Sequence, residues 1–267
     1  MVFLREGAKE GYNRKRNKGK NKKIYFIIFV MLIITFIVTS VISIKWLIAT
    51  NKSKSVNKEI ISSVTKIKNE STKENYNLEI DFNKLLEINN QVVGWIKIED
   101  TDINYPIVKG EDNSYYLTHN ILNESSQNGW IFMDYRNSDD FSDNNTVLYG
   151  HNIKSGIMFS DLTKIYNGKV NKDIIIYLKN GNIYRYAIYS CYMSEPDDIS
   201  INTKVKDSTL TDYMNQMKNR SVRQYNVNIV LNDNITLSTC DSSGKKRIIV
   251  HGIKQNEKGD IVYEKLQ

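Results

Sequence analysis

The sequence predicts a mainly β domain with a few added helices, closed or nearly closed into a barrel and preceded by a single N-terminal transmembrane helix. Two observations carry this prediction. An uncharged apolar run follows a basic N-terminal tail, and the rest of the chain alternates short apolar runs with Asn, Asp and Gly. Many short strands with few helices favour a barrel, because closure removes exposed strand edges.

The charge of the chain is concentrated at its N-terminus. The 267 residues carry a formal net charge of +7. Residues 1–23 hold nine basic and two acidic residues, so this tail alone accounts for +7 and the remainder is neutral. A neutral, mixed surface is typical of an ordinary solvated domain, and we expect no nucleic-acid partner.

The apolar run extends over residues 24–44 and contains no charged residue. It has about the length needed to cross a hydrocarbon core of roughly 30 Å as a helix. A cleaved signal peptide has a shorter apolar region of about 7 to 15 residues, so we favour a retained anchor over a cleaved signal or a buried core helix. The basic tail predicts a cytoplasmic N-terminus in the cell membrane and an outward-facing C-terminal part.

Four segments follow from this pattern: a cytoplasmic tail over 1–23, the anchor over 24–44, a stalk or packed N-terminal helix over 45–75, and one folded domain over 76–267. The third segment has apolar residues at helical spacing. They are Val56, Ile60, Ile61, Val64 and Ile67.

Apolar periodicity predicts the elements of the folded domain. Asp81 is expected to cap a helix carrying Phe82, Leu85, Leu86 and Ile88. Two later helices are expected near 158–165 and 208–220. The predicted strands are 95–98, 103–108, 130–133, 146–149, 174–178, 183–193, 235–239 and 248–253.

The chain has two cysteines, and their surroundings differ. Cys191 lies inside the apolar strand IYSCYM, where a free thiol behaves as a small hydrophobic group. Cys240 ends the strand ITLSTC and precedes a polar loop, so its side chain can face a substrate. A Cys191–Cys240 disulfide is the alternative in an exported protein.

A nucleophilic thiol needs a proton partner, and the chain offers three histidines. His151 ends the run TVLYGHN after a glycine, at a predicted strand end; an exposed turn histidine is the competing interpretation. His119 and His251 are rivals. His251 lies within an alternating strand, which favours a structural role.

An arginine could complete the site. Arg247 opens the strand that follows Cys240, so an antiparallel return would bring its guanidinium beside the sulfur. There it would lower the thiol pKa and offer forked donors to an oxyanion. Lys245 and Lys246 precede it, so a solvated basic stretch is the alternative. Lys246 would be a poor substitute, because it lacks the planar fork.

TLSTC near the C-terminus, YGHN earlier in the chain and an arginine opening the next strand together resemble the sortases. The segments VGWIKI, DNSYYLTHN and FMDYRN, and a helix-containing insertion over about 195–226, are similar to class B sortases. The resemblance runs from about residue 80 to 255.

The resemblance implies a β-barrel of about eight strands and a cysteine transpeptidase on the surface of a Gram-positive cell. Cys240 would attack the threonine carbonyl of an NP-x-T-like sorting signal, with His151 as acid and base and Arg247 as oxyanion partner. The acceptor would be an amine of a cell-wall peptide or its lipid-linked precursor, with no metal or organic cofactor. Family residues lining the peptide groove match Asn113, Leu117, Tyr149, Ser238 and Thr239, and Asp241 stands at an often acidic position.

Two other functions remain open on the residues alone. A cysteine hydrolase would use the same groups but release the peptide to water. A non-catalytic surface scaffold would instead pair Cys191 with Cys240. Labelling of a free thiol at position 240 separates the scaffold from the enzymes.

Overall fold

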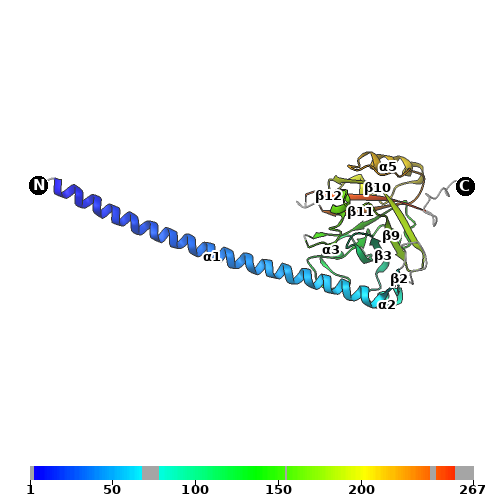
Figure 1. The fold of residues 1–267 in the computed structure, drawn as a ribbon, viewed down its shortest axis with the longest axis horizontal. Coiled ribbons are helices and arrows are strands. Elements are labelled where there is room, and N and C mark those ends of the chain that lie inside the picture. Colours follow the sequence, from blue (N-terminus) through cyan, green and yellow to red (C-terminus); the bar gives the residue numbers. More distant parts are fainter. Residues whose placement is uncertain (1–2, 68–77, 154, 241–244, 256–267) are drawn as a thin grey trace. The chain divides into compact units, whose positions relative to one another are not determined.

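A computed structural model describes residues 3–67, 78–153, 155–240 and 245–255. The chain forms two compact units, Met1–Ala49 and Thr50–Gln267. Figure 1 shows the helices and strands with their labels. The helix α1 (Phe3–Val64) contributes residues to both units.

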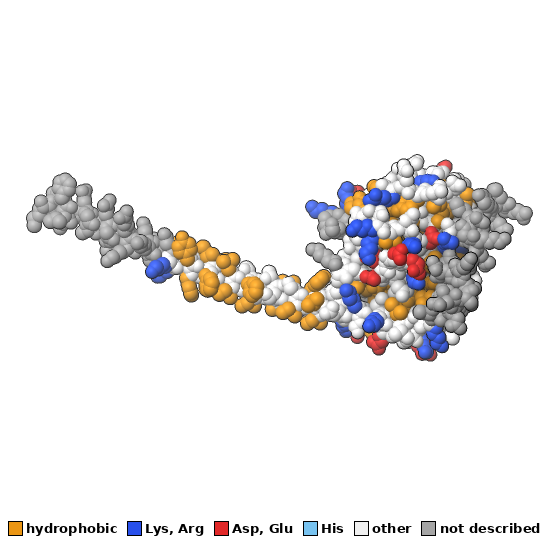
Figure 2. Space-filling model, viewed as in Figure 1, with side chains coloured by type: hydrophobic (Ala, Val, Ile, Leu, Met, Phe, Trp, Pro, Cys, Tyr) orange, Lys and Arg blue, Asp and Glu red, His pale blue; other side chains and the backbone are white. Residues whose placement is uncertain are grey.

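The first unit is the N-terminal part of α1. Its apolar side chains are exposed over residues 24–44, as the face in Figure 2 shows. The hydroxyls of Thr35, Thr39 and Ser43 donate to backbone carbonyls one turn earlier, at 2.8–2.9 Å. Such internal bonds satisfy polar groups in an apolar solvent. The helix is long and apolar enough to cross a membrane.

The second unit begins with the last turns of α1. Val56, Ile60 and Val64 are buried in the main core, so this part of the predicted stalk packs as a helix of the folded unit. The helix ends at Val64, and Ile67, which its spacing assigned to the helix, lies instead in the strand β1 (Thr65–Ile67). β1 pairs antiparallel with β2 (Leu78–Ile80).

Eight strands close into a barrel in the order β10-β12-β11-β6-β5-β4-β3-β9. Each contains or overlaps one predicted strand, so the predicted barrel is confirmed. β11 and β6 run parallel, as do β4 and β5, while the other neighbours are antiparallel. The strands are β3 (Val92–Ile98), β4 (Asn104–Val108), β5 (Phe132–Met133), β6 (Asn145–Tyr149), β9 (Ile174–Leu178), β10 (Ile183–Ser194), β11 (Asn234–Cys240) and β12 (Arg247–Lys254).

The short elements lie between the strands. The Asp81 carboxylate accepts from the Lys84 backbone N–H at 3.2 Å, which confirms it as the cap of α2. The helix expected near 158–165 begins only at Leu162, because Ile157 and Met158 pair with an earlier segment. The elements are α2 (Phe82–Ile88), α3 (Tyr115–Thr118), β7 (Asn152–Ile153), β8 (Ile157–Met158), α4 (Leu162–Tyr166), η1 (Ile199–Ile201) and α5 (Asp207–Asn219).

Two apolar clusters hold the unit together. The larger fills the barrel, and the smaller lies between α5 and the outer face of β10 and β12. Leu210, Met214 and Met217 supply the buried face of α5, which lies beside β10 in Figure 1. The insertion over 195–226 therefore covers one outer face of the barrel.

Candidate active site

The strand that ends at Cys240 lies between the strand that begins at Arg247 and the strand that leads to His151. Cys240 is the last residue of β11 and pairs directly with Arg247, the first residue of β12. On its other side β11 runs parallel to β6, with Ser238 opposite Tyr149 and the Gly150 N–H donating to the Ser238 carbonyl at 3.3 Å. β6 ends at Tyr149, and His151 follows two residues later. The ends of β6 and β11 and the start of β12 are thus neighbours in the barrel, and the meeting of the three predicted catalytic side chains stays a prediction.

The imidazole of His151 is held by a distant segment. Its Nε2 lies 2.8 Å from the carbonyl oxygen of Leu117 in α3. Its own carbonyl accepts from the Phe159 N–H at 3.0 Å. Because a carbonyl only accepts, Nε2 carries the proton in this contact, and in the neutral ring Nδ1 is then the basic nitrogen.

Two glycines make room for close contacts around His151: Gly129 packs against the His151 ring and the backbone of α3, and Gly150 packs against Phe159. Gly129 has φ of +54°, and a Cβ there would lie 2.4 Å from the Tyr116 carbonyl oxygen and 3.0 Å from the His151 ring. At Gly150 a Cβ would lie 2.8 Å from the Phe159 ring. The glycine before His151 therefore makes room for Phe159.

Arg247 lies in the barrel strand β12, whereas Lys245 and Lys246 lie in the segment before it. The backbone of Arg247 lies directly opposite that of Cys240 in the antiparallel pair of β11 and β12. Lys245 and Lys246 precede β12, and the Lys246 Nζ lies 3.6 Å from the Glu195 carboxylate at the surface.

Two of the predicted groove residues meet at a residue that the sequence did not single out. Asn113 Nδ2 and Tyr149 Oη both donate to the buried carboxylate of Asp134, each at 2.9 Å. Burial raises the pKa of Tyr149, and the nearby Asp134 charge raises it further. Asp134 lies in the quoted string FMDYRN, which is the only signal that could have pointed to it.

The other predicted groove residues differ in exposure. The Leu117 side chain is 39% exposed, whereas Ser238 and Thr239 are buried. Successive strand residues point to opposite faces, so the side chains of Ser238 and Thr239 lie on opposite faces of β11. Asp241 lies outside the described residues. A role of these residues in peptide binding stays a prediction.

The rival histidines have other surroundings. The His119 ring stacks on Tyr115, with ring centroids 4.1 Å apart, and its Nδ1 lies 2.9 Å from the Tyr115 carbonyl. His251 is fully buried, with contacts to Tyr192 Oη at 3.0 Å and Thr236 Oγ1 at 2.9 Å. Burial lowers the His251 pKa to about 3, so it is a neutral structural residue at neutral pH.

Cys191 is a free, buried thiol, so the predicted alternative of a disulfide is wrong. It pairs with Val250, which pairs in turn with Leu237, three residues before Cys240. Two strand spacings alone are roughly 10 Å, beyond the roughly 7 Å that a disulfide spans between Cα atoms. Burial raises the pKa of Cys191 to about 12, which keeps it protonated.

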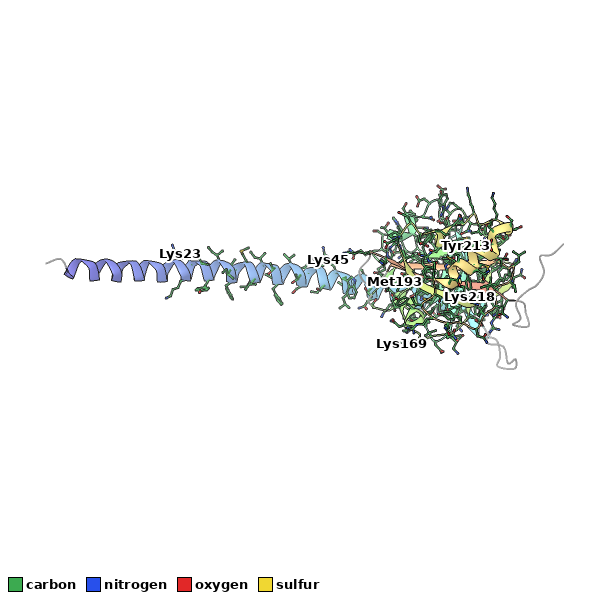
Figure 3. All side chains as sticks on the ribbon, turned by 90° about the horizontal axis from the view of Figure 1, so that it is seen from above. Lys23, Lys45, Lys169, Met193, Tyr213 and Lys218 are labelled. Atoms are coloured by element: carbon green, nitrogen blue, oxygen red, sulfur yellow. The ribbon has the colours of Figure 1, made fainter. Side chains whose placement is uncertain are left out.

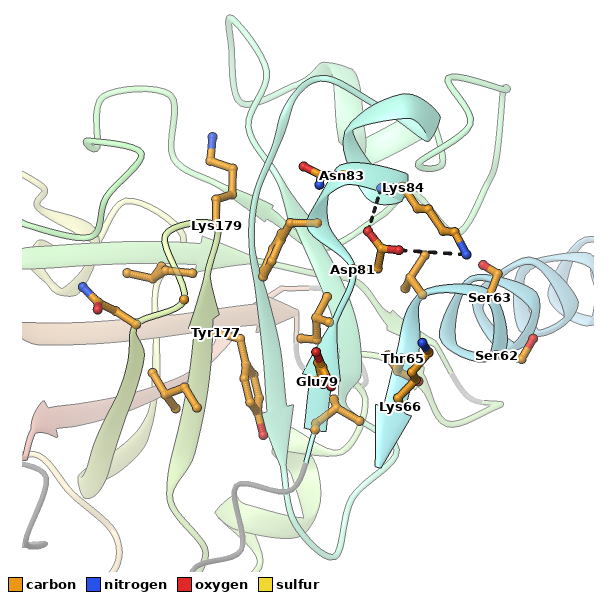
Figure 4. Close-up of a pocket in the computed structure, with 18 residues that line it drawn as sticks. Ser62, Ser63, Thr65, Lys66, Glu79, Asp81, Asn83, Lys84, Tyr177 and Lys179 are labelled. Carbon is orange, nitrogen blue, oxygen red and sulfur yellow. Dashed lines mark hydrogen bonds and ion pairs between the residues drawn. The ribbon is translucent and has the colours of Figure 1, made fainter. Parts of the chain in front are cut away.

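A cavity of about 570 Å³ lies elsewhere on the domain, between the β1–β2 pair, α2 and the turn that follows β9. Figure 4 shows its polar lining, including the Asp81–Lys84 ion pair. None of the predicted site residues lines it. Within the described part of the chain, no three His, Cys, Asp or Glu side chains are grouped as metal ligands.

The family model described as a sortase domain matches residues 96–255, which include all three strand ends of the site. The chain belongs to the sortase family. This sortase is 38% identical over 193 residues to sortase B of Listeria monocytogenes, covering 68% of this chain and 77% of the relative.

Solved structures agree with this assignment. Sortase B of Bacillus anthracis in complex with AAEK1 matches with a TM-score of 0.66 and 29% identity, over 78% of this sortase and 98% of that chain. A Staphylococcus aureus sortase B-substrate complex matches with a TM-score of 0.60 and 32% identity, over 66% and 85%. The predicted resemblance is confirmed: this sortase is a cysteine transpeptidase most similar to class B.

Proposed function

We propose that the enzyme cleaves an NP-x-T-like sorting signal of secreted proteins after its threonine and joins the new carboxyl end to an amine of a cell-wall peptide or its lipid-linked precursor. The observation that carries this proposal is the pairing of Cys240 with Arg247, next to the strand β6, which ends two residues before His151. The Staphylococcus aureus relative, whose structure is a substrate complex, supports a peptide ligand.

In the first step the Cys240 thiolate attacks the threonine carbonyl carbon. A C–S bond forms, the carbonyl π electrons move onto oxygen, and the Arg247 guanidinium stabilises the oxyanion by charge-assisted hydrogen bonds. The oxyanion collapses, the C–N bond breaks, and protonated His151 gives its proton to the departing amine. The product is a thioacyl enzyme.

In the second step the acceptor amine attacks the thioacyl carbon. Neutral His151 takes a proton from the attacking nitrogen, and the thiolate of Cys240 leaves with the C–S electrons. The outcome is an amide bond between the secreted protein and the cell-wall peptide, with the enzyme returned to its starting charge state. Cys240, His151 and Arg247 supply all the groups that these two steps require.

We further propose that residues 24–44 anchor the enzyme in the cell membrane with residues 1–23 in the cytoplasm and the barrel outside. Figure 3 shows Lys23 and Lys45 on α1, and the apolar segment lies between them. The nine cations of the tail favour the cytoplasmic side. This orientation places the active site where secreted proteins and cell-wall amines meet.

The test is mass spectrometry of the full chain in detergent with an NP-x-T peptide, with and without triglycine or a diaminopimelate-bearing peptide. We expect cleavage after threonine and an amine-linked product, both lost in Cys240→Ala. Release of the free acid alone, even with excess amine, would favour the hydrolase. An intact peptide under all conditions would contradict the proposed substrate class.

A further inference from the structure

We propose that Asp134 is a positioning residue of this sortase. Its buried carboxylate fixes which atoms of Tyr149 and Asn113 donate hydrogen bonds and which accept them, and so fixes which groups both side chains present to the peptide. The inference rests on the proposed function and goes beyond the catalytic residues. It depends on the contacts of one carboxylate that is fully shielded from solvent.

Five donors converge on the Asp134 carboxylate. Arg136 supplies three of them: Nε at 2.8 Å and the backbone N–H at 3.0 Å, both to Oδ1, and a terminal guanidinium nitrogen at 2.7 Å to Oδ2. Asn113 Nδ2 and Tyr149 Oη each donate to Oδ2 at 2.9 Å. One side chain therefore joins three segments that are distant in the sequence.

The charge of Asp134 is stable at neutral pH. Burial alone would raise the pKa of this carboxyl, but the hydrogen bonds from Arg136, Asn113 and Tyr149 outweigh it, and the pKa is lowered. A buried carboxylate is tolerated because a bidentate arginine compensates its charge. Asp134 is therefore ionised at neutral pH, and an ionised carboxylate can only accept hydrogen bonds.

This acceptor-only character determines how its neighbours are oriented. The Tyr149 hydroxyl gives its single proton to Asp134, and the Arg136 side chain also hydrogen-bonds to this oxygen, so a ligand can use only the remaining acceptor site. The Asn113 amide donates to Asp134 through Nδ2 and accepts the Tyr135 N–H through Oδ1 at 3.1 Å, which excludes the flipped amide. The ligand group that fits Tyr149 is therefore an N–H donor of the peptide.

The register places this cluster beside the nucleophile. Tyr149 is the last residue of β6 and lies opposite Ser238, two residues before Cys240. A hydroxyl held at this point can orient a peptide that reacts at the end of β11. Asp134 touches neither the peptide nor the reacting atoms in this proposal; it acts through Tyr149 and Asn113.

The experiment compares Asp134→Asn with the unmodified full chain in detergent. An amide in this place brings two N–H groups toward the donors of Arg136 and Tyr149, so the cluster must rearrange. We expect kcat/KM for the NP-x-T peptide to fall by about 10-fold to 100-fold, as for loss of a charge-assisted hydrogen bond. The rate at which iodoacetamide alkylates Cys240, which needs no peptide groove, should stay within about twofold at each pH.

Asp143→Asn is the matched control. Asp143 also accepts through its carboxylate from its own loop, from Asn137 Nδ2 at 3.0 Å and the Ser138 N–H at 2.5 Å. Among the described residues, its hydrogen bonds reach Asn137 and Ser138 but not Tyr149 or Asn113. We expect a lower melting temperature with unchanged kcat/KM. An equal loss of kcat/KM in both variants would overturn the proposal, because it would indicate general destabilisation.

Tyr149→Phe separates a positioning role from a folding defect. It removes one donor from Asp134 and leaves the Arg136 pair in place. We expect the double variant with Asp134→Asn to lose less than the product of the two single losses, because both act on one contact. Independent losses, or a parallel fall in alkylation, would overturn the proposal. Absence of the amine-linked product in the unmodified enzyme would instead contradict the proposed function.

Discussion

The imidazole Nε2 of His151 lies 2.8 Å from the carbonyl oxygen of Leu117, a residue in the short helix α3. This contact orients the ring and makes Nδ1 the basic nitrogen of the neutral form. Leu117 is itself one of the predicted groove residues. Leu117, whose carbonyl oxygen orients His151, thus belongs to the segment that we expect to contact the peptide.

His151→Ala should lower kcat/KM for transpeptidation by about 100-fold or more, because no other group in its place can exchange the proton. His119→Ala is the control, since its ring stacks on Tyr115 at the surface. Peptide cleavage followed by mass spectrometry measures both. Similar losses in the two variants would remove the basis for choosing His151.

Gly129→Ala should lower activity by disturbing His151. The new Cβ would meet the carbonyl oxygens of Tyr116 and Leu117 at 2.4 and 2.8 Å, besides the strain of a positive φ. Gly181→Ala is the control, because Gly181 has φ of +86° with no atom within 4 Å of the added Cβ. Both should lose about 1 kcal/mol or more of unfolding free energy from backbone strain. Only Gly129→Ala should also lose activity; normal turnover in this variant would contradict the contact.

Arg247→Ala should reduce turnover by about 100-fold, as expected for loss of an oxyanion donor. Arg247→Lys should remain strongly impaired although it keeps the charge, since an ammonium lacks the planar fork. Lys246→Ala should be nearly normal, because Lys246 precedes β12 and faces Glu195. A normal rate for Arg247→Ala in single-turnover acylation would contradict the oxyanion role.

Thiol labelling of the native chain should modify Cys240 and spare Cys191, whose burial raises its pKa to about 12. Cys191→Ala should keep its activity, and Cys240→Ala should lose both labelling and activity. Intact-mass spectrometry after iodoacetamide treatment counts the adducts. Two rapid adducts without denaturant would contradict the buried position of Cys191.

Stability should fall as the pH is lowered from about 6.5 toward 3, the interval between the ordinary pKa of His251 and its pKa of about 3 in the fold. The unfolded chain binds a proton there that the folded chain cannot, mainly because of burial and then the Arg220 charge, against an opposing effect of Asp198. The slope is about 1.4 kcal/mol per pH unit. Urea unfolding between pH 7 and pH 5 measures it, and His251→Asn should flatten the curve. An unchanged slope in that variant would assign the effect elsewhere.

The strands of the barrel could be predicted because each carries its own apolar pattern. Runs such as IIIYL at 174–178 bury every side chain, and each of the eight predicted strands contains or overlaps one barrel strand. The Asp81 cap and α5 were equally visible, since a helix start and a 3.6-residue apolar repeat are local signals. The pairs β1–β2 and β7–β8 and the helix α3 were missed, because two to four residues show no period.

The sequence was enough to select the candidate nucleophile, its histidine and its arginine, because TLSTC, YGHN and a strand-opening arginine are each short local motifs that together resemble the sortases. The arrangement of the strands that carry them is visible in the folded chain alone. The parallel pairing of β6 with β11 makes the strand that leads to His151 a neighbour of the strand that ends at Cys240. The convergence of three distant segments makes Asp134 the partner of Tyr149 and Asn113. Such contacts join residues far apart in sequence, and local patterns of hydrophobicity carry no information about them.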